Sequence, residues 1–528
     1  MRISAEQIQQ MNFTGDILRK EKVYPISIIP EEPMGPGDRT VVDFGNHFVG
    51  RVTLLLSSVG SHPDAPVLLR LKFCEHKKEI PRDSAEYEGW ISRGWIQEEI
   101  RHVDELPVMI RVERRYAFRY LVCDVIDTSS KFRLVIENVY AEEETSADDG
   151  KLADFSGTPS EQAVARVSCR TLRGCMQEVF EDGPKRDRRL WLGDLRLQAL
   201  ANYATYKNNG LVRKCLYLFA AAADERGREP ACLFTRPRLE GDDTFLFDYS
   251  LLYIAALRDY VRATGDTDTG RELWDTAFRQ WELSRDYLEN GIVKDCTDPA
   301  WCLIDWNMEL NKQAAAQGVH LYAGSALLEL GNMLFGCRKS VAVSAQDPDA
   351  AETKAPKKNP VLSDAEELAW RNMRKEISEG LRKEKNRAAE TFFDQQEQAF
   401  VSGGNRQLSV MSQAWCVLGG MADAESGKRV LLKALSDKTF LRPVTPYAYH
   451  SLIEAMLLCG MRRKAYETMM WYWGGMLDDG ADTFYELFDP EDPSASPYGS
   501  DIVNSYCHAW SCTPVYFMER FRLREGEL

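Results

Sequence analysis

The spacing of the hydrophobic residues changes near residue 150, and this change limits the chain to an architecture of two parts. Before it, short β-branched and aromatic runs such as 41–45, 49–56 and 119–125 are bounded by Gly, Pro and Asp, which is typical of β-strands. After Thr158, apolar residues recur at intervals of three and four residues, as in 250–260, which is typical of amphipathic helices. The sequence therefore predicts a multidomain β + α protein.

We expect a β-sandwich domain over residues 1–150, ending in a polar linker at 141–150, and a helical domain over residues 151–528. A length of 528 residues exceeds one typical core, which agrees with more than one domain. In the helical part, short turns such as 264–266 separate the helices. This arrangement fits αα-hairpins, and periodicity alone allows them to close into a ring or to stack as a solenoid.

Residues from about 339 to 390 break the apolar rhythm. Residues 344–360 are polar and punctuated by Pro, so we expect an exposed insertion here. The charged stretch 371–387 follows and is predicted to be a helix with a solvated face.

The composition argues against several classes of function. The formal net charge of −15 leaves no broad basic face for nucleic acid. No apolar run reaches the ~18 residues of a membrane span, and the segment that starts at Met1 does not open as a signal peptide. We therefore expect a soluble, cytoplasmic protein that binds neither nucleic acid nor membranes.

The cysteines predict no metal centre. The chain has 13 of them, an odd number, scattered through apolar segments such as 415–418. The nearest pairs, Cys507 with Cys512 and Cys296 with Cys302, lack metal-ligand spacing, and no second pair completes a zinc set. We interpret most of them as reduced thiols in the core.

The segment from Asp182 to Asp194 carries the strongest chemical signal. Its thirteen residues hold three carboxylates, four cations and an indole. Hydrolysis of an acetal needs one protonated carboxyl for the leaving oxygen and one carboxylate to activate water, and nearby arginines can separate the pKa values of such acids. Trp191 adds a flat face on which a sugar ring can stack. We interpret the segment as a carbohydrate-cleaving site; a salt-bridged surface turn is the alternative.

The spacing within this segment resembles the glycoside hydrolases of the inverting α-L-rhamnosidase type. Arg186, Asp187, Trp191 and Asp194 fall on the pattern of that family. The family usually has Glu where this chain has Asp187, so the acid here is one methylene shorter. It would have to lie closer to the glycosidic oxygen, and Asp182 or a neighbouring residue is the alternative acid. Residues 43–50 also resemble the β-sandwich that precedes the catalytic domain in the family. The resemblance implies that the helical domain is an (α/α)6 barrel of six hairpins.

A second motif lies far down the chain. In the resembled family a Gly-Ala-Thr stretch leads through an aromatic residue to the Glu that activates water. This chain has the corresponding residues Gly480, Ala481, Thr483, Tyr485 and Glu486, with Asp482 interposed. The resemblance implies that Glu486 is the base and Asp187 the acid. A role at a helix start is the alternative for Glu486, and Asp482 is the next candidate for the base.

Three further site elements follow from the resemblance. Asp305 and Trp306 resemble the pair that lines the family's sugar pocket, and His508 matches a late histidine that contacts the sugar. Asp248 is expected to cap a helix first and to line the site second. Packing in the core is the alternative for Trp306, and a hydrogen-bonded core position is the alternative for His508.

The expected reaction needs no cofactor, because both proton transfers come from side chains. Neither a metal nor an organic cofactor is implied, and the sequence has no nucleotide-binding loop and no Gly-x-Ser-x-Gly elbow. The expected partner is a carbohydrate substrate, a terminal α-L-rhamnoside or a similar sugar. The resemblance implies that hydroxyl contacts and ring walls come from Asp182, Arg186, Asp194, Trp191 and Trp306.

Two other kinds of function stay open. A non-catalytic carbohydrate-binding protein on the same scaffold would follow if the Asp at position 187 had removed catalysis. A lyase or a glycoside phosphorylase is the other, and Arg186, Arg188 and Arg189 would then supply a phosphate pocket. The oligomeric state is left open by the sequence.

Overall fold

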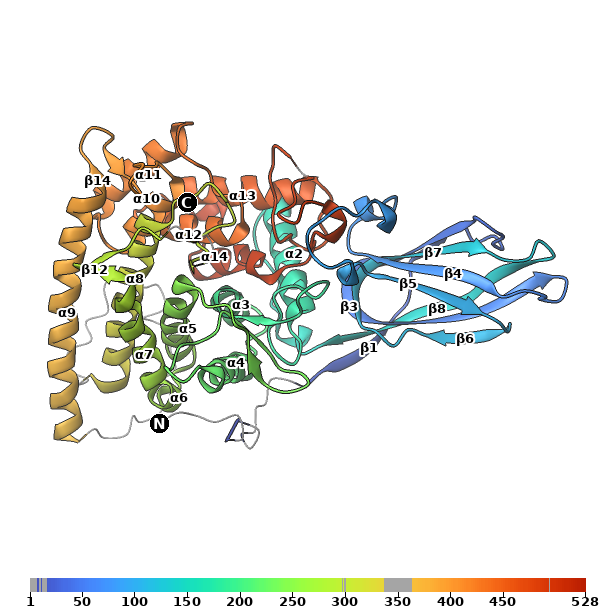
Figure 1. The fold of residues 1–528 in the computed structure, drawn as a ribbon, viewed down its shortest axis with the longest axis horizontal. Helices are drawn as coiled ribbons and strands as arrows, with labels where there is room; N and C mark the ends of the chain where they lie inside the picture. The colour runs from blue at the N-terminus through green and yellow to red at the C-terminus, as the bar shows by residue number, and fades with distance from the viewer. Residues whose placement is uncertain are drawn as a thin grey trace.

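The computed structural model describes residues 7–8, 11, 17–296, 298, 301–336, 363–492 and 494–528. A β-domain and a helical domain lie side by side along the long axis of the molecule (Figure 1). This arrangement confirms the predicted β + α architecture. The polar stretch 344–360, predicted as an exposed insertion, lies outside the described residues.

The β-domain is one antiparallel sheet with the strand order β1-β8-β3-β7-β4-β5, and β2 and β6 pair with β3. Its strands in the described residues are β1 (Arg19–Val23), β2 (Ser27–Ile29), β3 (Arg39–Gly60), β4 (Val67–Cys74), β5 (Glu98–Val103), β6 (Val108–Arg111), β7 (Tyr116–Asp127) and β8 (Phe132–Thr145).

The long strand β3 is shared by the two layers of this domain. Its first half pairs with β7 and its second half with β8, and both pairings meet at Gly50. A Cβ at Gly50 would lie 2.3 Å from the backbone oxygen of Glu142, so only glycine fits this crossing. The sheet thereby bends into two faces that enclose one apolar core drawn from β3, β4, β7 and β8. The predicted β-sandwich is confirmed.

The polar stretch 141–150 is a linker only in its second half. Residues 141–145 complete β8 and pair with β1. Lys20 of β1 lies opposite Glu144 and forms an ion pair with it at 3.0 Å, and such cross-strand pairs of opposite charge stabilise a polar strand. The first helix after the linker, α2 (Pro159–Cys175), begins with a capping box formed by Thr158 and Glu161.

The helical domain is a ring of paired helices. In the described residues the outer helices are α2, α4 (Asn209–Ala222), α7 (Trp274–Ser284), α9 (Asp364–Phe392), α11 (Ala424–Ser436) and α13 (Arg462–Asp478). The inner helices that follow them are α3 (Leu192–Ala204), α5 (Phe247–Thr264), α8 (Gln313–Phe335), α10 (Val410–Leu418), α12 (Pro446–Leu458) and α14 (Pro514–Arg520). A short helix, α6 (Thr267–Glu272), stands between α5 and α7.

The ring is closed. Helices α3, α5, α8, α10 and α12 pack in succession, α12 packs on the turn Ala509–Ser511 that leads into α14, and α14 packs back on α3. The solenoid alternative is therefore wrong. Inner helices such as α5 and α12 are buried on most of their faces, because the outer ring covers one side and the other inner helices cover the rest.

The charged helix α9 is an outer member of this ring and not an addition to it. It packs on α8 at the outer edge of the ring (Figure 1). Its apolar side chains Trp370, Ile377 and Leu381 are buried, while its other face is largely exposed. The solvated face predicted for 371–387 is confirmed, and the described part of 339–390 supplies one helix of the ring. No helix in the described part of the chain is long and apolar enough to cross a bilayer.

The loops that precede the inner helices meet at one end of the ring. Asp248 at the start of α5 accepts hydrogen bonds from residues 303 and 304, and Val444 before α12 donates to Asp305. The backbone N–H of Ala509 donates to the backbone oxygen of Asp182 at 2.9 Å. Segments far apart in sequence are thereby joined at this end.

Candidate active site

The charged segment 182–194 lies in the loop between α2 and α3 and ends in the first turn of α3. Asp187 and Arg188 have φ values of 61° and 56°, so two successive residues other than glycine adopt the left-handed conformation. The backbone N–H of Arg189 donates to Oδ1 of Asp182 at 3.0 Å and closes the turn. Such strained turns are typical of functional sites, and this one places Arg186 and Asp187 against the loop that precedes α14.

Glu486 lies in that second loop. Its N–H donates to the backbone oxygen of Ser505 at 3.1 Å, and the indole N–H of Trp510 donates to its backbone oxygen at 2.9 Å. Its carboxylate accepts a hydrogen bond from the guanidinium of Arg186 and forms an ion pair with it. The same guanidinium lies 3.8 Å from the carboxylate of Asp187. One guanidinium therefore contacts both carboxyls that the resemblance implies are acid and base.

Tyr498 is a site residue that sequence reasoning missed. Its hydroxyl donates to Oε1 of Glu486 at 2.8 Å, and its ring lies 4.0 Å from the guanidinium of Arg186. Burial raises the pKa of Glu486 above its usual value, whereas Arg186 and the hydrogen bond from Tyr498 act to lower it. Tyr498 lies in a loop rich in Pro and Ser, and no pattern in the sequence marks it.

His508 lies among three of the predicted carboxyls. Its Nε2 is 3.8 Å from Asp182 and 3.6 Å from Glu486, and its Nδ1 is 3.7 Å from Asp194. Burial and the charge of Arg186 hold the pKa of His508 well below its usual range, so the imidazole is neutral. Burial also raises the pKa values of Asp182 and Asp194 well above their usual range, and nearby carboxylates add to the effect. The cluster therefore holds protons that surface carboxyls would release.

Four buried polar atoms around Asp194 have no hydrogen-bond partner among the described residues: Asp194 Oδ1, His508 Nδ1, Trp191 Nε1 and Tyr447 Oη. Tyr249 links this group, because it donates to the other oxygen of Asp194 at 3.4 Å and its ring lies 6.3 Å from that of Trp191 and 6.0 Å from that of Tyr447. Buried polar atoms are normally paired, so this set of donors and acceptors suits a ligand rich in hydroxyls.

Aromatic rings form another wall of the site. The ring of Trp306 lies edge-on to those of Trp510 and Tyr498, with centroids 5.1 Å and 5.9 Å away. Trp510 in turn contacts the ring of His508 at 4.3 Å. Trp306 is only half-buried, so part of its indole stays open to a ligand.

Two other predicted carboxylates fasten loops together. Asp305 accepts hydrogen bonds from the backbone of Val444 at 2.9 Å and from the backbone and hydroxyl of Thr445 at 3.1 and 2.6 Å. Both of its oxygens are thereby engaged at the start of α12, which does not favour the predicted substrate contact. Burial raises the pKa of Asp305 to about 6.

Asp248 is not the N-cap of α5, so the prediction that it caps this helix is wrong. Its carboxylate accepts hydrogen bonds instead from the backbone N–H groups of residues 303–304, at 3.0 and 2.8 Å.

The β-domain contacts the charged segment through an ion pair. Lys185, next to Arg186, is buried and forms an ion pair with Glu79 of the β-domain. The same ammonium donates to the backbone oxygen of Asn504 at 2.7 Å, in the loop that carries Glu486. One lysine therefore connects both site loops to one carboxylate of the β-domain.

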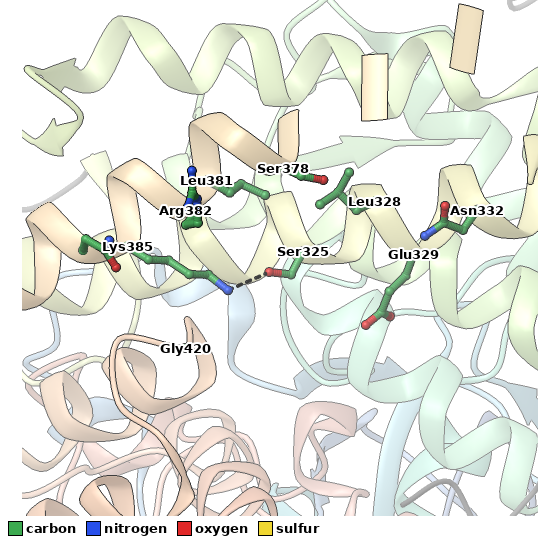
Figure 2. A pocket seen from close by; sticks show the side chains of 10 residues that line it. Ser325, Leu328, Glu329, Asn332, Ser378, Leu381, Arg382, Lys385 and Gly420 are labelled. Atoms are coloured by element: carbon green, nitrogen blue, oxygen red, sulfur yellow. Dashed lines mark hydrogen bonds between the residues drawn. The ribbon is translucent and has the colours of Figure 1, made fainter. Parts of the chain in front are cut away.

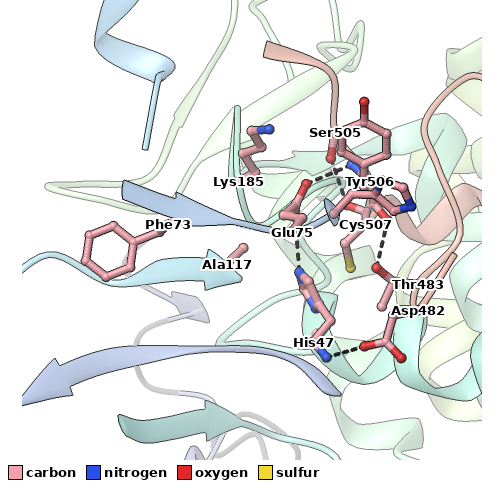
Figure 3. A network of polar contacts seen from close by, with 12 residues as sticks. His47, Phe73, Glu75, Ala117, Lys185, Asp482, Thr483, Ser505, Tyr506 and Cys507 are labelled. Carbon is pink, nitrogen blue, oxygen red and sulfur yellow. Dashed lines mark hydrogen bonds and ion pairs between the residues drawn. The ribbon is translucent and has the colours of Figure 1, made fainter. Parts of the chain in front are cut away.

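A second network between the domains supports the loop of Glu486 (Figure 3). Glu75 accepts a hydrogen bond from the backbone of Tyr506 at 2.7 Å and lies 3.1 Å from Nε2 of His47. Asp482 accepts from the backbone of His47 and forms an ion pair with Arg170. Asp482, the second candidate for the base, is thus engaged at the domain interface.

A cavity of about 480 Å³ lies elsewhere, between α8, α9 and the turn at Gly420 (Figure 2). None of the predicted site residues lines it, and its acid, Glu329, is paired with Arg258 and Arg262. Within the part of the chain that the structure describes, no cluster of His, Cys, Asp and Glu suits a metal ion. The candidate site is therefore the loop end of the ring.

Comparison with known protein families gives two matches. Residues 6–143 match the N-terminal domain of glycosyl hydrolase family 78 alpha-rhamnosidases, and residues 157–327 match the bacterial alpha-L-rhamnosidase six-hairpin glycosidase domain. Among curated proteins, none matches the chain.

Solved structures extend the likeness over the whole chain. A rhamnosidase from Klebsiella oxytoca with rhamnose bound is 38% identical, with a TM-score of 0.87 over 98% of both chains. A GH78 family rhamnosidase of Bacillus sp. GL1 shares the fold at 19% identity and a TM-score of 0.70, over 91% of this chain and 46% of that one. The Streptomyces avermitilis alpha-L-rhamnosidase complexed with L-rhamnose also shares the fold, at 14% identity and a TM-score of 0.66. The match covers 96% of this chain and 44% of that one.

Proposed function

Since the chain belongs to glycoside hydrolase family 78, an inverting family of α-L-rhamnosidases, we propose that it cleaves terminal α-L-rhamnosides with Asp187 as the acid and Glu486 as the base. The family resemblance and the glycosidase activity predicted from the sequence are confirmed. The catalytic roles proposed for Asp187 and Glu486 rest on the contacts around Arg186.

The observation that supports these roles is the shared guanidinium. Arg186 is bonded to Glu486 and lies 3.8 Å from Asp187, so the two carboxyls belong to one site although they come from loops at opposite ends of the helical domain's sequence. An inverting glycosidase needs two such groups, about 6.5 to 9.5 Å apart, with room for a water between them and the sugar.

In the proposed reaction Asp187 gives its proton to the glycosidic oxygen while the bond from that oxygen to C1 breaks. Glu486 takes a proton from the water whose oxygen forms the new bond to C1. The water arrives from the face opposite the leaving group, so the configuration at C1 inverts. Exchange of protons with solvent then returns both carboxyls to their starting states.

The exposure of the two carboxyls agrees with this division of roles. The side chain of Asp187 is 23% exposed and that of Glu486 only 5%. An acid at the mouth of the site meets the leaving group and regains its proton from solvent, whereas the base has to hold one water away from bulk solvent. The shorter Asp is compatible with the reaction because the left-handed turn at Asp187 and Arg188 sets the position of its backbone.

The rhamnose ring is proposed to occupy the space bordered by the unpartnered polar atoms. Neutral His508, Trp191 and Tyr447 can each donate to a hydroxyl, and Asp194 Oδ1 can accept from one. Trp306 supplies an apolar face for the ring and its methyl group.

The arginines do not support the phosphorylase alternative. Arg189 lies 4.2 Å from the ring of Phe234, and Arg188 is half-buried near Arg115 and Glu181, with two of its guanidinium nitrogens unpartnered among the described residues. Arg186 is engaged by two carboxylates. The arginine that reaches the two proposed catalytic carboxyls is therefore not free to bind phosphate, and hydrolysis is favoured over phosphorolysis.

The reaction is tested by following p-nitrophenyl α-L-rhamnoside with proton NMR, with and without phosphate. The first sugar formed is expected to be β-L-rhamnose in both cases, because water attacks from the opposite face. Initial release of α-L-rhamnose, or formation of rhamnose 1-phosphate, would contradict the proposal.

The role of Asp187 is tested by Asp187→Asn. If Asp187 protonates the leaving oxygen, the turnover of substrates with sugar leaving groups falls by about 10²–10⁴-fold, whereas activated aryl rhamnosides lose far less because their oxygen needs little protonation. The measurement is kcat/KM against leaving-group pKa.

Asp187→Glu is the matched variant, since it keeps the carboxyl and adds one methylene. We expect lower activity than wild type on both substrates, because the site is built around the shorter acid. Equal losses on both substrates in Asp187→Asn would instead assign Asp187 a binding role.

The pH dependence of kcat/KM is set by Glu486, and the hydrogen bond from Tyr498 shifts it. Glu486 must be ionised to act as base, so activity falls as the pH drops through its pKa, which burial raises above 4.5. The hydrogen bond from Tyr498 favours the ionised form, and Tyr498→Phe removes it. The acidic limb of the kcat/KM profile is therefore expected to move to higher pH in Tyr498→Phe.

Tyr253→Phe is the control for this profile, because Tyr253 donates to the backbone oxygen of Leu216 and does not touch Glu486. Its acidic limb is expected to stay at the wild-type position. A limb that is unmoved in Tyr498→Phe, or moved to lower pH, would show that Glu486 is not the group that titrates.

A further inference from the structure

The most exposed tryptophan near the site comes from the β-domain. Trp90 lies in the long connection between β4 and β5 and is 74% exposed. Its backbone N–H donates to the backbone oxygen of Tyr498 at 3.1 Å, and its indole N–H donates to that of Pro497 at 3.0 Å. A large apolar ring is thus fixed in place by both of its donors and still faces solvent.

Tyr498 lies between the ring of Trp90 and the carboxylate of Glu486. The ring of Trp90 lies 5.9 Å from the ring of Tyr498, whose hydroxyl is bonded to Glu486. Tyr498 is 5% exposed, so the order from the interior outward is Glu486, Tyr498, Trp90. Trp90 is therefore part of the rim of the candidate site, beside the ring of Tyr498, which lies 4.0 Å from the guanidinium that contacts both proposed catalytic carboxyls.

The connection that carries Trp90 is anchored to the helical domain. Tyr87 packs in one apolar cluster with Ile502 and Val503 of the loop that precedes α14. Arg82 pairs with Asp501 at 2.9 Å. Figure 1 shows this connection, in blue, at the junction of the two domains beside segments of the C-terminal part in red.

Two glycines allow the close approach. Gly89 and Gly499 face each other, because a Cβ on Gly499 would lie 3.8 Å from the Cα of Gly89. Gly499 has a φ of 77°, and a Cβ on Gly89 would lie 2.5 Å from the hydroxyl oxygen of Tyr87. The backbone geometry on both sides therefore holds Trp90 next to Tyr498.

We propose that Trp90 is the platform of a subsite for the leaving group, on which a flat ring of the aglycone stacks. This inference rests on the proposed function, which places the rhamnose among the buried polar atoms and the leaving group toward solvent. The shared chemistry of the ligand is a six-membered ring with an apolar face, which both an aromatic aglycone and a pyranose present. The N-terminal domain would thus contribute to substrate choice.

The test compares three substrates: methyl α-L-rhamnoside, p-nitrophenyl α-L-rhamnoside and an α-L-rhamnosyl-glucose disaccharide. For Trp90→Ala we expect kcat/KM to fall about five- to tenfold on substrates with a ring in the leaving group, in line with the strength of one ring contact. The kcat/KM for methyl α-L-rhamnoside and the inhibition constant of free L-rhamnose are expected to stay at wild-type values. A loss on only one of the two ring substrates identifies which ring the platform takes.

Two variants make this test selective. Trp90→Phe keeps a smaller ring and is expected to give an intermediate loss. Trp471→Ala removes another exposed tryptophan, which is 55% exposed on the outer helix α13. It is expected to leave kcat/KM unchanged for all three substrates.

The outcomes separate the two proposals. Wild-type turnover with unchanged selectivity in Trp90→Ala, or an equal loss on all three substrates, would overturn the subsite and leave the proposed function in place. A wild-type protein that turns over none of the three rhamnosides would overturn the proposed function and the subsite with it.

Discussion

The buried contact between Arg186 and Glu486 is the interaction on which the site depends. It joins the loop before α3 to the loop before α14, and the same guanidinium reaches Asp187 and lies against the ring of Tyr498. Breaking a comparable buried pair by removing one partner costs about 3–5 kcal/mol, because the other charge is left uncompensated. The charges that the reaction needs are thus the charges that hold the two loops together.

The β-domain contributes to this arrangement. Glu79 fixes Lys185 beside Arg186, and Glu75 binds the backbone of Tyr506 in the opposite loop. Trp90 from the same domain lies on the outer side of Tyr498. Both loops that supply the proposed acid and base are therefore held by the sandwich, and the position of their carboxyls depends on contact between the two domains.

The sequence allowed the architecture and part of the site to be predicted, because both leave local signals. The change of hydrophobic period predicted the two domains, and the motifs around Asp187 and Glu486 named two residues that meet at one guanidinium. Tyr498 and Trp90 were missed, since their importance arises only when distant loops meet. Asp305 matched the motif of a site residue, yet its carboxylate is engaged by the start of α12, a contact that spacing along the chain does not encode.

Glu486→Gln tests whether Glu486 is the base that activates the attacking water. The amide keeps the shape of the carboxylate and an oxygen that can still accept a hydrogen bond from Arg186, but it cannot take the proton of the attacking water. We expect kcat to fall by about 10²–10⁴-fold while calorimetry gives a Kd for L-rhamnose near the wild-type value. Unchanged turnover in a variant that still binds L-rhamnose would contradict the account and assign the base to another residue.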